Sequence, residues 1–267
     1  MAKGSKLSKM AANRLAVSGA VLSSAEVHGA QLAKDLHATL FPAGPHKPEL
    51  TEKFVDALGQ LLDRAAQEVK DSDLAHSAEL LDDEEPRQRR DGLCAELSAA
   101  LLGLRDTLTG LYGADTARAY ALSDALPQLP TQLVQRARIV ETLLRKQPLP
   151  SRPQRAGVTV KAAVLADELL PLIDQLGVAL LDVQRESREA QLSLERKTRA
   201  AEAWQRTYQG VTSAFYGLYL LAGRKDLAER IEPTARRRAG IPEDGDPSPP
   251  EPALKGGPPA GPTPAWG

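Results

Sequence analysis

One leucine-rich pattern occurs twice in this chain, and the repetition limits the folds that the sequence can adopt. Residues 97–112 carry apolar side chains at alternating steps of four and three and end in Gly110-Leu111-Tyr112. Residues 204–219 repeat these steps and end in Gly217-Leu218-Tyr219, at a constant offset of 107 residues (219 − 112). Steps of three and four place side chains on one face of a helix. The chain is therefore predicted to contain two copies of one amphipathic helical unit.

The match continues toward the start of each copy. Residues 54–63 resemble residues 165–174 at an offset of 111 (174 − 63), so the first copy has four additional residues between its matched blocks. Four residues are close to one helical turn and change the helix phase only slightly. Proline-rich breaks precede both copies, at residues 42–48 and 148–153. Chance similarity between leucine- and alanine-rich helices is the alternative explanation.

Because a period near 107 residues is too long for a solenoid unit, we expect an all-α protein built from two related, tandem antiparallel helical bundles. The first repeat is predicted to span residues 1–126 and the second residues 127–239. Residues 240–267 contain nine of the chain's 20 prolines. Such a segment cannot bury enough apolar surface to offset the entropy cost of ordering, so we expect a disordered tail.

The expected helices follow the apolar periodicity and end at prolines and glycines. Their approximate bounds are Ser8–Leu40, Glu49–Leu81, Asp82–Tyr112, Asp115–Leu126, Thr131–Lys146 and Asp226–Arg238. Residues 158–221 form either one long helix or a hairpin that turns within Gln184–Arg199. We favour the long helix, because its heptad pattern is clearly interrupted only at Ser187 and Lys197, and because the suggested turn contains no glycine or proline.

Composition narrows the function classes. The formal net charge is −1, so no global field attracts the chain to nucleic acid or to an anionic membrane. The single cysteine, Cys94, excludes an intrachain disulfide and is expected to be a small core residue. No apolar stretch approaches the length of a membrane-spanning helix. These features favour a cytoplasmic protein.

The motifs of common active sites are absent. A di-iron or dimanganese bundle needs Glu-x-x-His pairs, and none of the four histidines has a glutamate three residues before it. The nearest approach, Asp73-Leu74-Ala75-His76, is expected on a solvated helix face. The sequence also lacks phosphate-binding loops and nucleophile motifs. We therefore expect no cofactor, no metal and no catalytic residue.

Two pairs of acids recur in both copies, seven residues apart and on nearly one helix face. They are Asp56 with Asp167 and Asp63 with Asp174. They are interpreted either as partners in interhelix salt bridges or as acids that face solvent.

Five residues are candidates for contacts with a partner: Gly110, Tyr112, Gly217, Tyr219 and Trp266. Glycines at seven-residue spacing allow a helix to approach closely, either within the fold or between subunits. The two tyrosines could face a partner at the surface. Trp266 is either an anchor in the tail or a chance residue in a disordered end.

The residue patterns favour a non-enzymatic helical scaffold or adaptor that acts through protein–protein contacts and can self-associate. A loose basic patch, Arg136, Arg138, Arg145 and Lys146, supports an alternative, an electrostatic binder of nucleic acid or anionic surfaces. The second alternative is a helical enzyme whose site no motif reveals.

Overall fold

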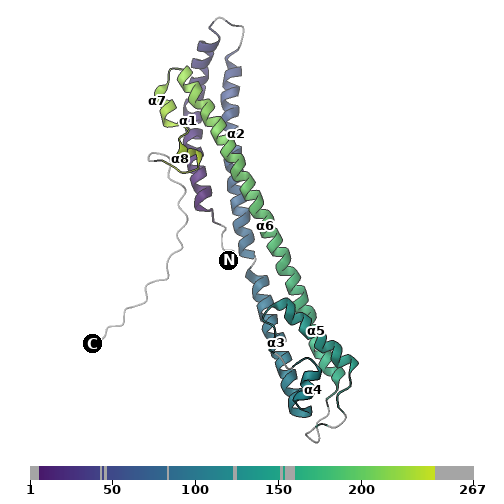
Figure 1. Cartoon of the computed structure of the whole chain (residues 1–267). Coiled ribbons are helices and arrows are strands. Elements are labelled where there is room, and N and C mark those ends of the chain that lie inside the picture. Colours follow the sequence, from purple (N-terminus) through teal and green to yellow (C-terminus); the bar gives the residue numbers. More distant parts are fainter. Residues whose placement is uncertain are drawn as a thin grey trace, which may run out of the picture. The chain divides into compact units, whose positions relative to one another are not determined.

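The computed structural model of the chain describes residues 6–42, 44, 47–82, 84–122, 125–150, 153 and 160–243 (Figure 1). Within these ranges the regular structure is helical and no strand occurs, which confirms the all-α prediction. The helices are α1 (Lys9–Leu40), α2 (Pro48–Asp82), α3 (Glu84–Tyr112), α4 (Ala114–Ala119), α5 (Pro130–Lys146), α6 (Ala162–Leu221), α7 (Lys225–Arg230) and α8 (Ala235–Arg238). None of these described helices combines the length and apolar character that a membrane crossing needs.

Local sequence signals account for most helix ends. Ser8 caps α1 by accepting a hydrogen bond from the Ala11 amide. The favoured long helix is confirmed, because α6 runs unbroken for 60 residues with Pro171 inside it. The single final helix expected at Asp226–Arg238 is wrong. Pro233 lacks an amide donor and disfavours helix before it, so α7 ends at Arg230.

The chain folds into two compact units that each combine distant segments. Unit 1 consists of Met1–Ala78 and Leu192–Gly267, and unit 2 of Glu79–Gln191. The long helix α6 contributes its N-terminal half to unit 2 and its C-terminal half to unit 1. This grouping differs from the expected division at residue 126, because each unit takes segments from both predicted repeats. The repeats themselves remain a prediction about sequence ancestry.

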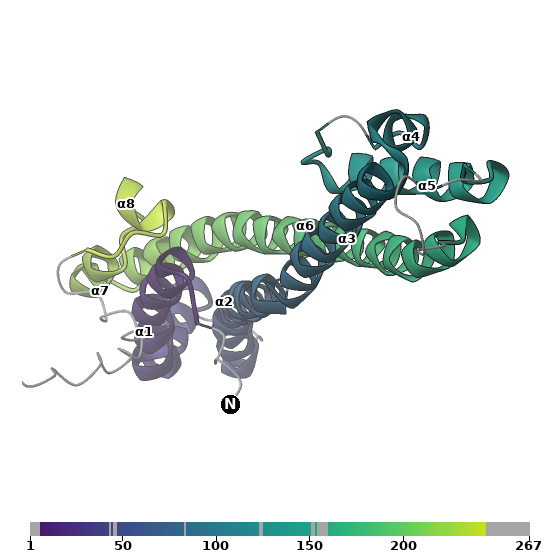
Figure 2. The same ribbon diagram turned by 90° about the horizontal axis from the view of Figure 1, so that it is seen from below.

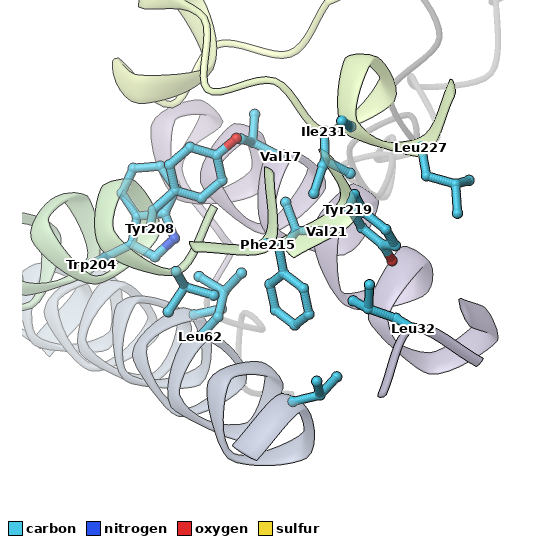
Figure 3. Packing of buried hydrophobic residues seen from close by; sticks show 14 of the residues in the cluster. Val17, Val21, Leu32, Leu62, Trp204, Tyr208, Phe215, Tyr219, Leu227 and Ile231 are labelled. Atoms are coloured by element: carbon cyan, nitrogen blue, oxygen red, sulfur yellow. The ribbon is translucent and has the colours of Figure 1, made fainter. Parts of the chain in front are cut away.

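Unit 1 has an aromatic core. Trp204, Tyr208, Phe215 and Tyr219 project from α6 and are at most 1% exposed. Figure 3 shows these rings together with aliphatic side chains of α1 and α2 and of the segment that follows α6. The same buried cluster contains small side chains, namely Ala11, Val17, Val21, Ala33 and Ala66, as well as larger ones such as Leu32, Leu36 and Leu62. The rings of α6 therefore pack among aliphatic side chains of mixed size.

Unit 2 has an aliphatic core. Helices α4 and α5 lie beside α3 (Figures 1 and 2), and the N-terminal half of α6 completes the cluster. The fully buried side chains are mostly leucine, isoleucine and valine: Leu97, Leu101 and Leu108 from α3, Val140 and Leu144 from α5, and Ile173 and Leu176 from α6. Tyr120, directly after α4, donates its hydroxyl hydrogen to the Gln147 carbonyl at 2.9 Å.

Candidate functional site

A buried carboxylate joins three helices in unit 1. Asp73 of α2 is 0% exposed. Its carboxylate accepts hydrogen bonds from the Ser8 amide at 2.6 Å and the Ser8 hydroxyl at 2.7 Å. The ammonium of Lys197, on α6, lies 2.7 Å from the same carboxylate. We call Ser8, Asp73 and Lys197 the Asp73 clamp.

The sequence positions of the clamp residues explain its geometry. Asp73 lies four residues after the buried Val69, on the inward face of α2, and Lys197 lies three residues before the buried Ala200 of α6. Asp73 is fully buried, whereas Lys197 is half-buried and reaches it from the edge of the core. Ser8 caps α1, so the Asp73 carboxylate also lies at the helix end where negative charge is favourable.

The clamp keeps the Asp73 carboxyl group ionised. Burial alone would raise its pKa, but the Lys197 ammonium and the Ser8 amide and hydroxyl together outweigh burial and lower the pKa below its ordinary value. The carboxylate is therefore charged at neutral pH and fully engaged. It joins α2 to the start of α1 and to α6.

Neighbouring polar side chains extend this contact between α2 and α6. His76 is 9% exposed, and its Nδ1 lies 2.9 Å from the Ser193 hydroxyl. The expectation that Asp73 and His76 lie on a solvated helix face is wrong, because α6 covers that face and supplies Lys197 and Ser193. A signal was present in the sequence, since residues 69, 73 and 76 continue the inward stripe of α2.

The largest buried side chain of unit 1 also has a polar contact. Trp204 donates its indole hydrogen to the Ser18 hydroxyl at 2.8 Å. The Arg14 guanidinium lies 5.5 Å from the centre of the Trp204 ring, a cation–π distance. Burial lowers the pKa of Arg14. Gly240 closes over this pair with φ +73°, and a Cβ atom there would lie 2.7 Å from Arg14 Cγ.

The candidate contact residues lie in different environments. Tyr219 is fully buried, and its hydroxyl lies 2.9 Å from the Ser24 hydroxyl, so it connects α6 to α1 instead of facing a partner. Tyr112 and Gly217 are half-buried, whereas Gly110 is exposed. Trp266 lies outside the described residues.

The glycine stripe makes no close contact in the part of the chain that the structure describes. A Cβ atom added at Gly103, Gly110, Gly210 or Gly217 would meet nothing within 4 Å. Close packing within the fold therefore does not explain these glycines. Contact between subunits stays a prediction.

The residues of the basic patch have acidic or carbonyl partners. Arg138 pairs with Asp174 at 3.5 Å, and Arg145 pairs with Asp167 at 2.9 Å and with Glu141. Arg136 donates to the Ala121 carbonyl at 2.9 Å, and Lys146 is exposed. The salt-bridge interpretation of Asp167 and Asp174 is confirmed. These partners offset much of the patch's positive charge.

Two other features were not expected from the sequence. Glu79, Glu186 and Glu189 offer carboxylate oxygens within 4.8 Å of one another on the surface of unit 2. Acids at this spacing are common on exposed helices. Cys94 is half-buried, so the expected core position is only partly correct, and burial raises the pKa of its thiol. A raised pKa disfavours the reactive thiolate.

No family model, no curated protein and no solved structure matches this chain. Its function is therefore argued from its own residues.

Proposed function

We propose that this chain is a non-enzymatic helical scaffold or adaptor that acts through protein–protein contacts, self-association included. The proposal extends to its origin, the duplication of one helical module.

The apolar surface of α2 carries the proposal. Leu50, Phe54 and Leu61 are 63%, 53% and 44% exposed, although the adjacent face of the same helix supplies Val55 and Leu62 to the core of unit 1. The exposed residues follow steps of four and seven, so they share one helix face. Contiguous exposed apolar side chains favour a protein contact. A second copy presents the same face, as a symmetric interface requires.

The polar groups inside unit 1 support the same class of function. Asp73, Lys197 and Ser18 each hold one helix against another. A buried charge that is already paired and hydrogen-bonded contributes to the specificity of helix pairing more than to chemistry.

Support for the duplication comes from the burial pattern. Several residues that the two predicted repeats match, at offsets of 111 for residues 54–63 and 107 for residues 97–112, are buried in both repeats. The matched pairs are Val55 with Ala166, Leu62 with Ile173, Leu97 with Trp204, Leu101 with Tyr208, Leu104 with Val211, and Leu108 with Phe215. The first segment is followed by Gly113 and the six-residue helix α4, the second by Gly223 and the six-residue helix α7.

Light scattering over a concentration series tests the proposed contact. We expect the full chain to exceed the mass of one copy at high concentration, and Leu61→Glu to abolish the increase. Leu181→Glu is the matched control, because Leu181 is an exposed leucine of unit 2 (65%) outside this face. A chain that ends at residue 243, the last residue of the described segment 160–243, separates any contribution of the residues that follow. Masses of one copy at every concentration would remove self-association from the proposal. A stoichiometric metal found by elemental analysis would contradict a non-enzymatic scaffold.

A further inference from the structure

The turn between the two predicted repeats contains an alanine in a glycine conformation. Ala121 has φ 59° and is the one residue other than glycine with a left-handed backbone among those described. The Ala121 amide donates to the Arg118 carbonyl and the Leu122 amide to the Ala117 carbonyl, both at 3.0 Å. This is the Schellman pattern, in which glycine usually occupies the left-handed position.

Two other helix ends in the described chain make the same pair of hydrogen bonds with glycine. Gly223 follows α6 and Gly240 follows α8, each with φ +73° and the same spacing of backbone partners. Ala121 is therefore the strained member of a set of three. A Cβ atom in the left-handed region disfavours the turn by a factor of roughly five or more.

This turn directs the chain from α4 back onto α5. Arg136 of α5 donates to the Ala121 carbonyl at 2.9 Å, and the Tyr120 hydroxyl donates to the Gln147 carbonyl at 2.9 Å. Both contacts join the chain before the turn to the chain after it. If Ala121 adopts an extended conformation instead, the chain does not turn back. Helix α5 and the residues after it then no longer pack against α3 and α4 of the same copy.

Each unit needs chain from both sides of the turn. In unit 1, Asp73 precedes the turn and Lys197 follows it. In unit 2, Leu101 precedes it and Ile173 follows it, in one buried cluster. Neither the segment before the turn nor the segment after it forms a complete core by itself. When the two segments of one chain are separated, a second copy of the chain can supply the matching segment to each.

We propose that the chain forms exchanged dimers. In such a dimer, the segment before Ala121 of one copy packs against the segment after Ala121 of the other copy, and each such pair of segments forms one unit 1 and one unit 2. The dimer reproduces the core contacts of the single chain and relaxes the turn. The inference goes beyond the proposed surface contact and does not use the exposed face of α2.

The strain at Ala121 brings this exchange into an accessible concentration range. A short linker gives the two sides an effective concentration of the order of millimolar, which favours the closed single chain. The exchanged dimer relaxes two turns, one per copy. This lowers its dissociation constant roughly 30-fold, from the order of millimolar to tens of micromolar. Exchange separates both cores, so it is expected during folding and is slow in the folded protein.

Substitutions at Ala121 test the role of the turn. After slow refolding at about 100 µM, a concentration near the expected crossover, we expect the dimer fraction to rise in the order Ala121→Gly, wild type, Ala121→Val. Glycine removes the strain and raises the dissociation constant roughly 30-fold, whereas the β-branched valine increases the strain. Ala119→Gly and Ala119→Val are matched controls on the exposed face of α4 and should not produce this order. Equal dimer fractions in the three Ala121 proteins would overturn the proposal.

A disulfide then reports which segments are paired. His76 and Ser193 are in side-chain contact and lie on opposite sides of the turn, so His76→Cys with Ser193→Cys, in a Cys94→Ser background, can join them. Exchanged dimers become covalent dimers on a non-reducing gel. Dimers that contain only intrachain disulfides would overturn exchange and leave the surface contact standing. An Ala121→Val protein that stays monomeric at every refolding concentration would also overturn the proposed exchange. Hybrids of tagged and untagged copies, formed by joint refolding and stable to dilution, provide a second measurement that needs no cysteine.

Discussion

Units 1 and 2 bury side chains at positions that the predicted repeats match, but different chemistry stabilises the two units. Unit 1 buries four aromatic rings of α6, together with one fully enclosed carboxylate. Unit 2 has Leu97, Leu101 and Leu108 at three of the matched positions of α3 and the half-buried Tyr112 at the fourth, and its interhelix ion pairs lie on the surface. Both cores combine small and larger aliphatic side chains, and the four aromatic rings of α6 distinguish the core of unit 1.

The comparison shows that two helical units in one chain can be stabilised differently, one by aromatic rings and a buried, paired carboxylate, the other by leucines and surface ion pairs. Asp73 is buried because Lys197 and Ser8 accompany it. Asp174, on the surface of unit 2, needs only one flexible arginine. A buried position tolerates a charge where a facing residue pairs with it, as Lys197 does for Asp73.

The largest expected effect compares the matched core residues Trp204 and Leu97. Trp204→Ala should lower the free energy of unfolding by about 3–5 kcal/mol, because it leaves a cavity and removes the partner of the buried Ser18 hydroxyl. Leu97→Ala, which removes fewer atoms and no hydrogen bond, should cost about 2–4 kcal/mol. Urea denaturation followed by circular dichroism measures both. A larger loss for Leu97→Ala would contradict this ranking of the two core residues.

The next effect is specific to the buried charge. Asp73→Asn should lower the free energy of unfolding by about 2 kcal/mol at pH 7, since the amide cannot accept all the hydrogen bonds of the carboxylate and leaves the Lys197 ammonium without its counter-charge. The folded-state pKa of Asp73 lies below its ordinary value. Its contribution is therefore complete above the unfolded pKa, about 3.9, and is lost as the pH falls through the folded pKa. The difference between wild type and variant should shrink in that acidic range.

Asp71→Asn is the matched control for this pH dependence. Asp71 lies on the same helix, is exposed, and accepts a hydrogen bond from the Gln67 side chain at 2.8 Å. Thermal denaturation from pH 3 to pH 7 should show little change for this variant. If Asp73→Asn gave a difference from wild type that stayed constant down to pH 3, the clamp would not stabilise the fold through its charge.

Local signals in the sequence were sufficient for most of the helices. The Ser8 cap, the prolines at 42 and 148 and the absence of breakers in Gln184–Arg199 predicted where α1 and α5 end and that α6 is continuous. Pro233 carried an equally clear signal, and the expected final helix overlooked it. These features depend only on neighbours along the chain.

The pairing of helices could not be predicted in the same way. Asp73 and Lys197 each interrupt an apolar stripe, but nothing local to either helix indicates that the two stripes face each other. Tyr219 was a candidate for a partner contact because it ends a repeated motif, and Ser24 of α1 lies against it in the core. The grouping of the chain into units crosses the repeat boundary for the same reason, since it depends on tertiary contacts.

A smaller effect contrasts the turn of unit 2 with the glycine turns of unit 1. Ala121→Gly should raise the free energy of unfolding of the single chain by roughly 1 kcal/mol, because glycine adopts the left-handed conformation without strain. Gly223→Ala, the reverse change at the Schellman turn after α6, should lower it by a similar amount, since a Cβ there meets no neighbour within 4 Å and only the backbone is strained. Denaturation at low protein concentration isolates these effects from association. Changes of the same sign in the two variants would contradict the assignment of strain.

The smallest effect concerns the surface ion pairs of unit 2. Arg138→Gln and Arg145→Gln, alone or combined, should leave the unfolding midpoint within experimental scatter, because exposed pairs are hydrated in the unfolded chain and screened by salt. The same substitutions should not change the retention of the protein on heparin or DNA at moderate ionic strength, since Asp167 and Asp174 already offset both arginines. If retention on heparin or DNA fell steeply with salt and was weaker still in the double variant, the result would instead support the alternative function, electrostatic binding of nucleic acid or anionic surfaces. In that case the acids of α6 would be arranging the arginines for a polyanion, and the two units would differ in function as well as in packing.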